Sequence, residues 1–185
     1  RTRMGQLYQS FSEDAGITWS KPEPTGLASS YSPAALKTIP TTGDLVCVWN
    51  QGSSQEVVDG LGRMRISCAV SKDDGKTWTH FQNVESLDDT TRIKPELGTT
   101  DAVSELHALK ERAFLKSGST RTSYPESITG RYPRWPGFIH NDYPSVSFTR
   151  SGNVVMVYGA SDHETAGLTI GLKFIARPID WLYDA

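Results

Sequence analysis

Hydrophobic and polar residues alternate along the stretch from Arg63 to Val70, a period of two that is typical of a β-strand. One face carries Arg63, Arg65, Ser67 and Ala69, and the other carries Met64, Ile66, Cys68 and Val70. The strand runs into the octet SKDDGKTW, in which Asp73 can accept hydrogen bonds from backbone amides and Gly75 can take a positive φ. We therefore predict a strand, a tight turn and a return strand in succession.

The octet occurs a second time, earlier in the chain, as SEDAGITW. Both copies fit the pattern S-x-D-x-G-x-T-W. Its fixed positions include Ser12, Asp14, Gly16 and Trp19 in the first copy and Ser71, Asp73, Gly75 and Trp78 in the second. A turn motif that is shared within one short chain indicates an internal structural repeat.

The first complete repeat is predicted to be a four-stranded antiparallel unit. A strand at 5–11 leads into the first octet, and 20–26, which contains two prolines and a glycine, is predicted to be a loop. The stretches 32–39 and 45–50 form a hairpin around a turn at 41–44. The strands on either side of the second octet complete the unit near Val84.

The hairpin pattern returns at 143–148 and 154–159, around a turn at 150–153, and 169–175 is predicted to be a third strand. Repeated four-stranded meanders with a shared motif are typical of a β-propeller, in which each blade packs against its neighbours. The chain holds parts of three blades, whereas a closed ring needs at least about four. We therefore predict an all-β fold in which residues 1–185 are the C-terminal part of a larger propeller. The start at Arg1 without a methionine indicates a processed or truncated product.

Residues 85–140 are longer than a connection between blades should be, and we interpret them as an insert. A stripe of hydrophobic residues at 100–116 predicts one helix, capped by Thr100 or Asp101. The following stretch, 117–140, is rich in aromatic residues and proline and is predicted to be an ordered loop. Two roles stay open for the insert: it covers a site or contacts a partner, or it packs on the outside of the ring.

The composition is that of an ordinary globular domain, with 185 residues, 37% of them hydrophobic, and a net charge of −2. The charge and the scattered basic residues argue against a nucleic-acid partner, and no apolar run approaches the roughly 20 residues that span a bilayer. Cys47 and Cys68 lie in apolar strand patterns and are predicted to be buried free thiols. The histidines lie apart from one another and from the cysteines, so neither a metal nor a cofactor is expected.

The doubled octet is the Asp-box, and its setting resembles the sialidase (neuraminidase) superfamily of six-bladed propellers. The resemblance covers about two thirds of the chain and excludes the insert. Asp-boxes, which also occur in other propellers, lie away from the active site in this family. The resemblance therefore gives Asp14 and Asp73 a structural role in their turns. It also implies a protein that acts outside the cytosol, secreted or periplasmic.

Sialidases share three arginines that grip the substrate carboxylate, and two of them precede Asp-boxes at characteristic distances. Arg63 and Arg1, eight and eleven residues before the two octets, match these positions, with Arg3 and Arg65 as alternatives. A planar guanidinium meets a carboxylate with two parallel charge-assisted hydrogen bonds, which suits this role. The alternative is that these arginines are simply solvated at strand ends.

Tyr143 begins the innermost strand of its predicted blade and matches the position of the tyrosine nucleophile of sialidases. A phenol, whose ordinary pKa is near 10, is a poor nucleophile at neutral pH unless a base lies beside it. A neutral phenol suits attack on a centre that carries a carboxylate, because an anionic nucleophile would be repelled. In the alternative interpretation Tyr143 only packs at the start of a strand.

The family's catalytic glutamate, its acid/base aspartate and its first triad arginine would all precede Arg1, so the chain lacks a complete catalytic set. The resemblance implies a parent protein that cleaves terminal sialic acid or a related acidic sugar from glycoconjugates with retention of configuration. It also implies that the remaining N-terminal part of the ring is a partner of this chain. Two alternatives stay open: a non-catalytic propeller that binds glycan or protein, and a purely structural propeller segment.

Overall fold

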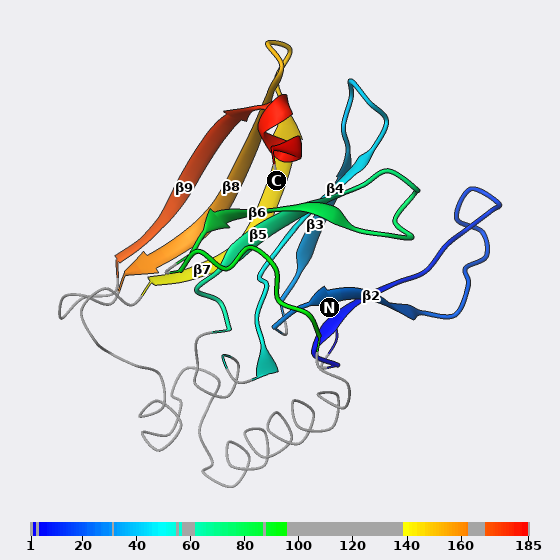
Figure 1. Ribbon diagram of the computed structural model, residues 1–185, viewed down its shortest axis with the longest axis horizontal. Helices are drawn as coiled ribbons and strands as arrows, with labels where there is room; N and C mark the ends of the chain where they lie inside the picture. The colour runs from blue at the N-terminus through cyan, green and yellow to red at the C-terminus, as the bar shows by residue number, and fades with distance from the viewer. Residues whose placement is uncertain are drawn as a thin grey trace, which may run out of the picture.

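The computed structural model describes residues 2, 4–30, 32–54, 56, 62–86, 88–95, 139–162 and 169–184 (Figure 1). Arg1 and the helix predicted at 100–116 lie outside these residues, as does most of the 85–140 insert. The roles of Arg1 and of the insert therefore stay predictions. The elements whose bounds lie within the described residues are β-strands and one 3-10 helix near the C-terminus, and Ser54 and Glu56 are also helical.

A four-stranded antiparallel sheet forms the centre of the described fold. Its strands are β3 (Ala34–Thr38), β4 (Leu45–Trp49), β5 (Ile66–Ser71) and β6 (Thr79–Glu85), in that order across the sheet. The turn between β3 and β4 includes Gly43, whose φ of 82° is a conformation that glycine adopts without strain. This sheet is the four-stranded unit that the sequence predicted.

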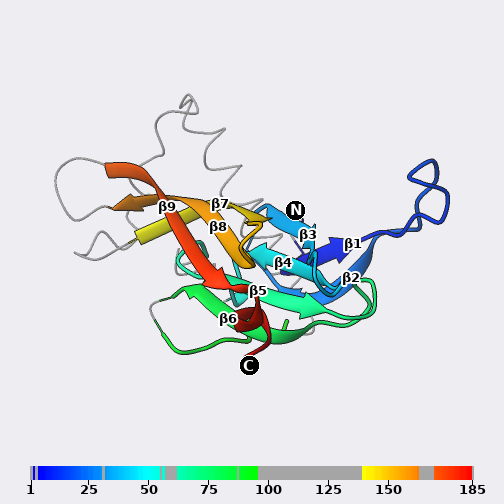
Figure 2. The ribbon, with the colours of Figure 1, turned by 90° about the horizontal axis from the view of Figure 1, so that it is seen from above.

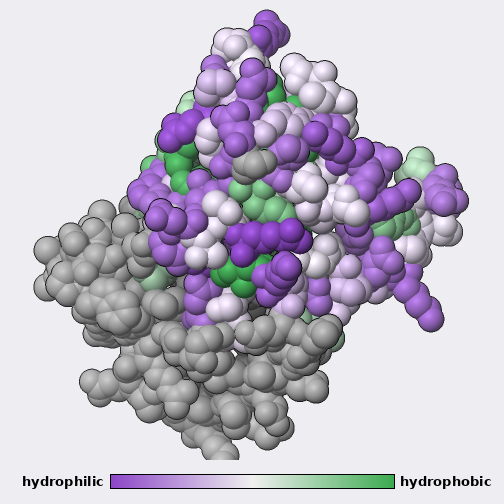
Figure 3. Space-filling view, in the orientation of Figure 1, coloured by the Kyte–Doolittle hydropathy of each residue, from purple (hydrophilic) through white to green (hydrophobic). Residues whose placement is uncertain are grey.

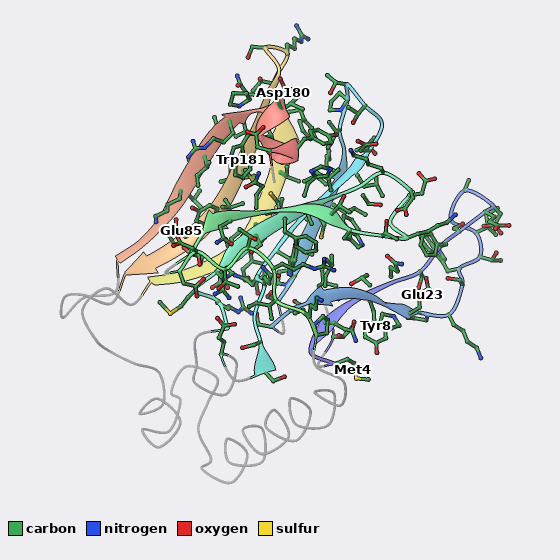
Figure 4. All side chains as sticks on the ribbon, in the orientation of Figure 1. Met4, Tyr8, Glu23, Glu85, Asp180 and Trp181 are labelled. Atoms are coloured by element: carbon green, nitrogen blue, oxygen red, sulfur yellow. The ribbon has the colours of Figure 1, made fainter. Side chains whose placement is uncertain are left out.

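A second antiparallel sheet consists of β7 (Ile139–Phe148), β8 (Asn153–Asp162) and β9 (Thr169–Pro178), in that order. The predicted hairpin and third strand are present, and each strand is longer than predicted, with 10 residues. The 3-10 helix η1 (Ile179–Tyr183) follows β9. Gln82 of β6 donates a hydrogen bond of 3.0 Å to the carbonyl of Trp181, which fastens η1 to the central sheet (Figure 4).

The N-terminal strands β1 (Gln6–Gln9) and β2 (Glu23–Ala28) flank the first octet and pair antiparallel in a two-stranded sheet. The prediction of a loop at 20–26 is therefore wrong from Glu23 onward. The prolines and the glycine argued for a loop, but Pro24 pairs with Tyr8 in a sheet of two strands, both of which are edges. An edge strand tolerates a residue that has no backbone N–H to donate.

Both faces of the central sheet are covered, which explains why all six residues of β5 are buried. One face packs against the β7–β9 sheet and η1 in a cluster that includes Val48 and Met156. The other face packs against β1 and β2 in a cluster that includes Leu7 and Trp49. Figure 2 shows the three sheets from above. A four-stranded sheet of sequential antiparallel strands, packed on each face by a neighbouring sheet, is the arrangement of a propeller blade, and the prediction of an all-β, partial propeller is confirmed.

Cys47 and Cys68 lie in the neighbouring strands β4 and β5, where both are buried and free, as predicted. Burial raises the pKa of each thiol to about 12, because it disfavours the charged thiolate. On the outside, the face in Figure 3 is mostly hydrophilic over the described residues, and its hydrophobic residues form small separate groups. This face therefore gives no sign of a large apolar docking surface.

Candidate functional site

Arg63 and Tyr143, two residues predicted to act in a site, lie next to each other in the structure. The guanidinium carbon of Arg63 is 5.6 Å from the centroid of the Tyr143 ring, a cation–π arrangement. Arg63 also forms an ion pair with the carboxylate of Asp142. The side chains of Arg63 and Asp142 are 23% and 28% exposed, and Tyr143 is 59% exposed, so a ligand can reach this cluster from solvent.

Tyr143 does not begin its strand, contrary to the prediction, but lies inside β7, which starts at Ile139. The register between β7 and β8 shifts between Asp142 and Ser145, so that Tyr143 and Pro144 form a β-bulge. The bulge follows from Pro144, which has no N–H for the ladder. Tyr143 has a φ of 50°, a left-handed conformation that costs a non-glycine residue about 1–2 kcal/mol.

Two asparagines, both fully buried, fasten the backbone of 63–65 to β7. The Nδ2 group of Asn50 donates to the carbonyl oxygens of Arg65, at 3.1 Å, and Asn141, at 3.0 Å. Asn141 donates its backbone N–H to the Arg63 carbonyl, at 2.8 Å, and its Nδ2 group to the Met64 carbonyl, at 3.0 Å. We call these two residues and their bonds the asparagine clasp.

Arg65, the alternative arginine, is engaged elsewhere. Its side chain is 6% exposed and pairs with Glu56 at 2.8 Å and with Asp88 at 2.5 Å. Burial works against the charge of Arg65, but the hydrogen bonds to Asp88 and Glu56 outweigh it and raise the pKa of the guanidinium. Burial likewise works against the charge of Asp88, but the bond from Arg65 helps to lower the pKa of that carboxyl. A guanidinium that already pairs with two carboxylates has few N–H groups left to bind a ligand.

The segment that follows β6 is bonded to Gln51 and Arg65, close to the candidate site. Gln51, which is 1% exposed, donates a hydrogen bond from its side-chain Nε2 group to the carbonyl of Thr91 at 2.9 Å. Its Oε1 atom accepts a hydrogen bond of 2.7 Å from the N–H of Ile93. Together with the Arg65–Asp88 pair, these bonds position residues 88–93 close to the stretch that carries Arg63.

In each octet the aspartate and the serine organise the turn with the same hydrogen bonds. Asp73 accepts from the backbone N–H and the hydroxyl of Thr77, at 2.8 and 2.6 Å, and Asp14 accepts from Thr18 at the same distances. The serine hydroxyl accepts from the glycine N–H at 2.8 Å in both copies. The threonine hydrogen bonds are the main reason that the pKa of Asp14 and of Asp73 is lowered to about 2.

The two octets differ in what surrounds them. Trp78 is 9% exposed and belongs to the hydrophobic cluster that includes Trp49 and Phe81, whereas Trp19 is 64% exposed. Trp19 nevertheless keeps a hydrogen bond within its own turn, from Nε1 to the carbonyl of Gly16 at 3.0 Å. The octet is thus a self-contained turn whose tryptophan packs into a core in one of its two copies.

Another polar cluster joins the central sheet to the β7–β9 sheet without involving a predicted site residue. Glu85, the last residue of β6 (Figure 4), accepts hydrogen bonds from the hydroxyl of Tyr158, at 2.7 Å, and from the ammonium group of Lys173, at 2.8 Å. Burial, and then the hydrogen bond to Glu85, raises the pKa of Tyr158. The phenol therefore stays protonated and acts as a donor between the two sheets.

Three residues of the candidate site were not predicted from the sequence: Asn50, Asn141 and Asp142. Asn141 and Asp142 directly precede Tyr143, so their position beside a predicted site residue was the available signal. Asn50 had no such signal, because its two acceptors lie 15 and 91 positions away in the sequence.

The family model that describes the BNR repeat-like domain matches residues 1–158. The chain belongs to the BNR repeat-like domain family. This confirms the Asp-box, or BNR-repeat, recognition made from the two octets. The matched residues include the central sheet and also Arg63 and Tyr143. The match assigns no role to either residue.

Other comparisons add little to the assignment of this BNR repeat-like domain. None of the curated proteins matches it. One solved structure that is similar to the chain is the alpha-L-arabinanase of Penicillium chrysogenum complexed with arabinobiose, with 14% identity and a TM-score of 0.43. The match covers 92% of this chain and 36% of the arabinanase, so the chain spans about a third of the length of that protein.

Two searches of the described residues concern other kinds of site. In the part of the chain that the structure describes, no three histidine, cysteine, aspartate or glutamate side chains gather as metal ligands would. Among the same described residues, no helix is both long enough and apolar enough to cross a membrane.

Proposed function

We propose that this chain contributes to the active site of a retaining glycoside hydrolase of the sialidase type, which removes terminal sialic acid or a related acidic sugar from glycoconjugates. The observation that carries the proposal is the contact between Arg63 and Tyr143. A cation that can grip a carboxylate lies beside an exposed phenol that can attack a sugar. Membership of the BNR repeat-like family supports the same conclusion.

Each residue has a distinct role in the proposed reaction. Arg63 binds the carboxylate of the sugar through two charge-assisted hydrogen bonds, and Arg1, outside the described residues, supplies a second guanidinium. The Tyr143 oxygen attacks the anomeric carbon as a glutamate outside this chain takes the phenol proton, and the bond to the leaving group breaks. Water then cleaves the sugar–tyrosine bond, so the two displacements retain the configuration. The N-terminal part of the ring supplies the acid, the base and the third arginine.

One observation favours a second candidate, a non-catalytic propeller that binds a glycan or a protein. The carboxylate of Asp142 already pairs with Arg63. A substrate carboxylate would have to share the guanidinium with Asp142 and would meet a like charge beside it. A neutral glycan hydroxyl or a backbone carbonyl would accept a hydrogen bond from Arg63 without that repulsion.

Turnover of a fluorogenic aryl α-sialoside by the full polypeptide that carries this chain tests the first candidate. Tyr143→Phe removes the nucleophilic oxygen and should abolish turnover, while binding of free sialic acid survives. Tyr8→Phe, on β1 (Figure 4), is the matched control and should keep the wild-type rate. An unchanged rate in Tyr143→Phe would exclude the nucleophile role.

The substitution Arg63→Lys tests carboxylate binding separately from the chemistry. A lysine keeps the charge but loses the two-pronged contact, so sialic acid should bind about 2 kcal/mol more weakly, roughly 30-fold in Kd. Arg150→Lys, in the exposed β7–β8 turn, is the matched control. If Arg63→Lys binds sialic acid normally while a neutral glycan binds to both proteins equally well, the second candidate is favoured.

A further inference from the structure

The asparagine clasp connects two parts of the candidate site that belong to different sheets. Asn50 follows β4 of the central sheet, and Asn141 lies in β7 of the second sheet. Between them they donate hydrogen bonds to three consecutive carbonyl groups, those of Arg63, Met64 and Arg65. The Asn50 amide also bonds to the carbonyl of Asn141, which joins the two clasp residues directly.

The clasp is buried, so its bonds are costly to lose. Asn50 and Asn141 are both 0% exposed. If a buried carbonyl loses its hydrogen-bond donor, the fold is destabilised by the full desolvation penalty of that group, because water cannot replace the bond. The backbone that carries Arg63 therefore cannot move relative to Asn141 without leaving several buried groups unpaired.

The clasp also lies next to strained backbone. Tyr143, two residues after Asn141, has a φ of 50° inside a β-bulge. Strained conformations of this kind persist only where the surrounding structure over-determines them. Both the backbone N–H and the side chain of Asn141 bond to the segment that precedes β5, and Asp142, between Asn141 and Tyr143, pairs with Arg63.

We propose that Asn50 and Asn141 are positioning residues of the candidate site, which set the guanidinium of Arg63 against the ring of Tyr143. The inference rests on the proposed function for the chemical roles of Arg63 and Tyr143. The relative placement of these two residues does not depend on the proposed function. Neither asparagine touches substrate in this scheme. Both act through the backbone of the residues that do.

The kinetic test uses the full polypeptide that carries this chain and the fluorogenic aryl α-sialoside. Asn141→Ala and Asn50→Ala should each lower kcat/KM at least tenfold, with kcat accounting for most of the loss. The double variant should lose no more than the worse single variant, because the two residues act as one unit. Asn153→Ala, at the start of β8 beside the turn at the far end of the β7–β8 hairpin, is the matched control and should keep the wild-type kcat and KM.

A second readout does not depend on turnover. With 3-fluorotyrosine at position 143, the ¹⁹F resonance reports the surroundings of the ring, and Arg63→Gln identifies the shift caused by losing the cation. Asn141→Ala and Asn50→Ala should move or broaden this resonance to a similar extent, whereas Asn153→Ala should leave it unchanged. A wild-type protein that lacks sialosidase activity would contradict the proposed function and leave this test of the clasp intact.

Folded Asn50→Ala and Asn141→Ala proteins whose ¹⁹F resonance stays at the wild-type position would overturn the inference. If Asn141→Ala does not fold, Asn50→Ala decides, because it keeps both bonds that Asn141 donates. Rescue provides the final check: Asn50→Gln retains the amide donor and should recover part of the wild-type signal, whereas Asn50→Leu, which has similar size and no donor, should not.

Discussion

The carboxylate of Asp142, in β7, forms an ion pair with the guanidinium of Arg63, which precedes β5 in the neighbouring sheet. Both side chains are about three-quarters buried, so neutralising one leaves the other charge partly desolvated. We expect Asp142→Asn to lower the free energy of unfolding by about 1 kcal/mol, discounted for the remaining exposure. Urea unfolding measures this change.

Asp89→Asn is the control for that measurement. Asp89 is exposed, so its neutralisation should change the free energy of unfolding by less than about 0.5 kcal/mol. An Asp142→Asn protein as stable as Asp89→Asn would show that the ion pair contributes nothing to the fold.

The Asp-box aspartates predict a specific loss of stability in acid. The pKa of Asp73 and of Asp14 is about 2 in the fold, lowered first by the threonine hydroxyl bonds, against an ordinary 3.8. Because the folded pKa is the lower one, each contribution is complete above about pH 5 and is lost as the pH falls toward 2. Urea midpoints between pH 6 and pH 2 should therefore fall less steeply in Asp73→Asn than in the wild type. An unchanged slope would contradict this origin of the acid sensitivity.

The two octet tryptophans should differ strongly in their contribution to stability. Trp78→Ala removes a buried ring from the cluster with Phe81 and should cost about 3 kcal/mol, whereas Trp19→Ala should cost less than about 1 kcal/mol. Trp19 is the matched control, because it occupies the same position of the same turn. Equal losses in urea unfolding would mean that the turn, rather than the packing, determines the cost.

The left-handed backbone of Tyr143 predicts a conflict between stability and function. Asparagine tolerates this conformation better than tyrosine, so Tyr143→Asn relieves strain but loses the contact with Arg63. These two effects are each about 1 kcal/mol, and we expect the free energy of unfolding to change by less than about 0.5 kcal/mol. Turnover should be lost. A destabilisation of several kcal/mol would show that the tyrosine side chain is needed for the fold.

The sequence was sufficient for the parts of the fold that depend on local pattern. Alternation predicted β5 and the two hairpins, and the octets predicted tight turns held by Asp14 and Asp73, with bonds from backbone amides to Asp73. The prediction failed where proline was decisive. Pro24 was interpreted as part of a loop although an edge strand tolerates it, and Pro144 was placed at a strand start although it lies in a bulge.

The candidate site was predictable only in part, because its contacts join distant segments. Arg63 and Tyr143 were predicted through their positions relative to known motifs, and the structure brings them together. Arg65 has the same residue type and nearly the same position as Arg63, yet it is committed to Glu56 and Asp88. Which arginine faces a ligand depends on partners that no local pattern specifies, and the asparagine clasp was missed for the same reason.

The two cysteines provide an internal measure of how often the central sheet opens. A thiol with a pKa of about 12 has almost no thiolate at neutral pH, and burial in β4 and β5 also denies access to alkylating reagents. Cys47 and Cys68 can therefore be labelled only when their strands separate. The rate at which the native protein takes up label, compared with its unfolding rate, tells whether the sheet opens by itself or only with the whole domain.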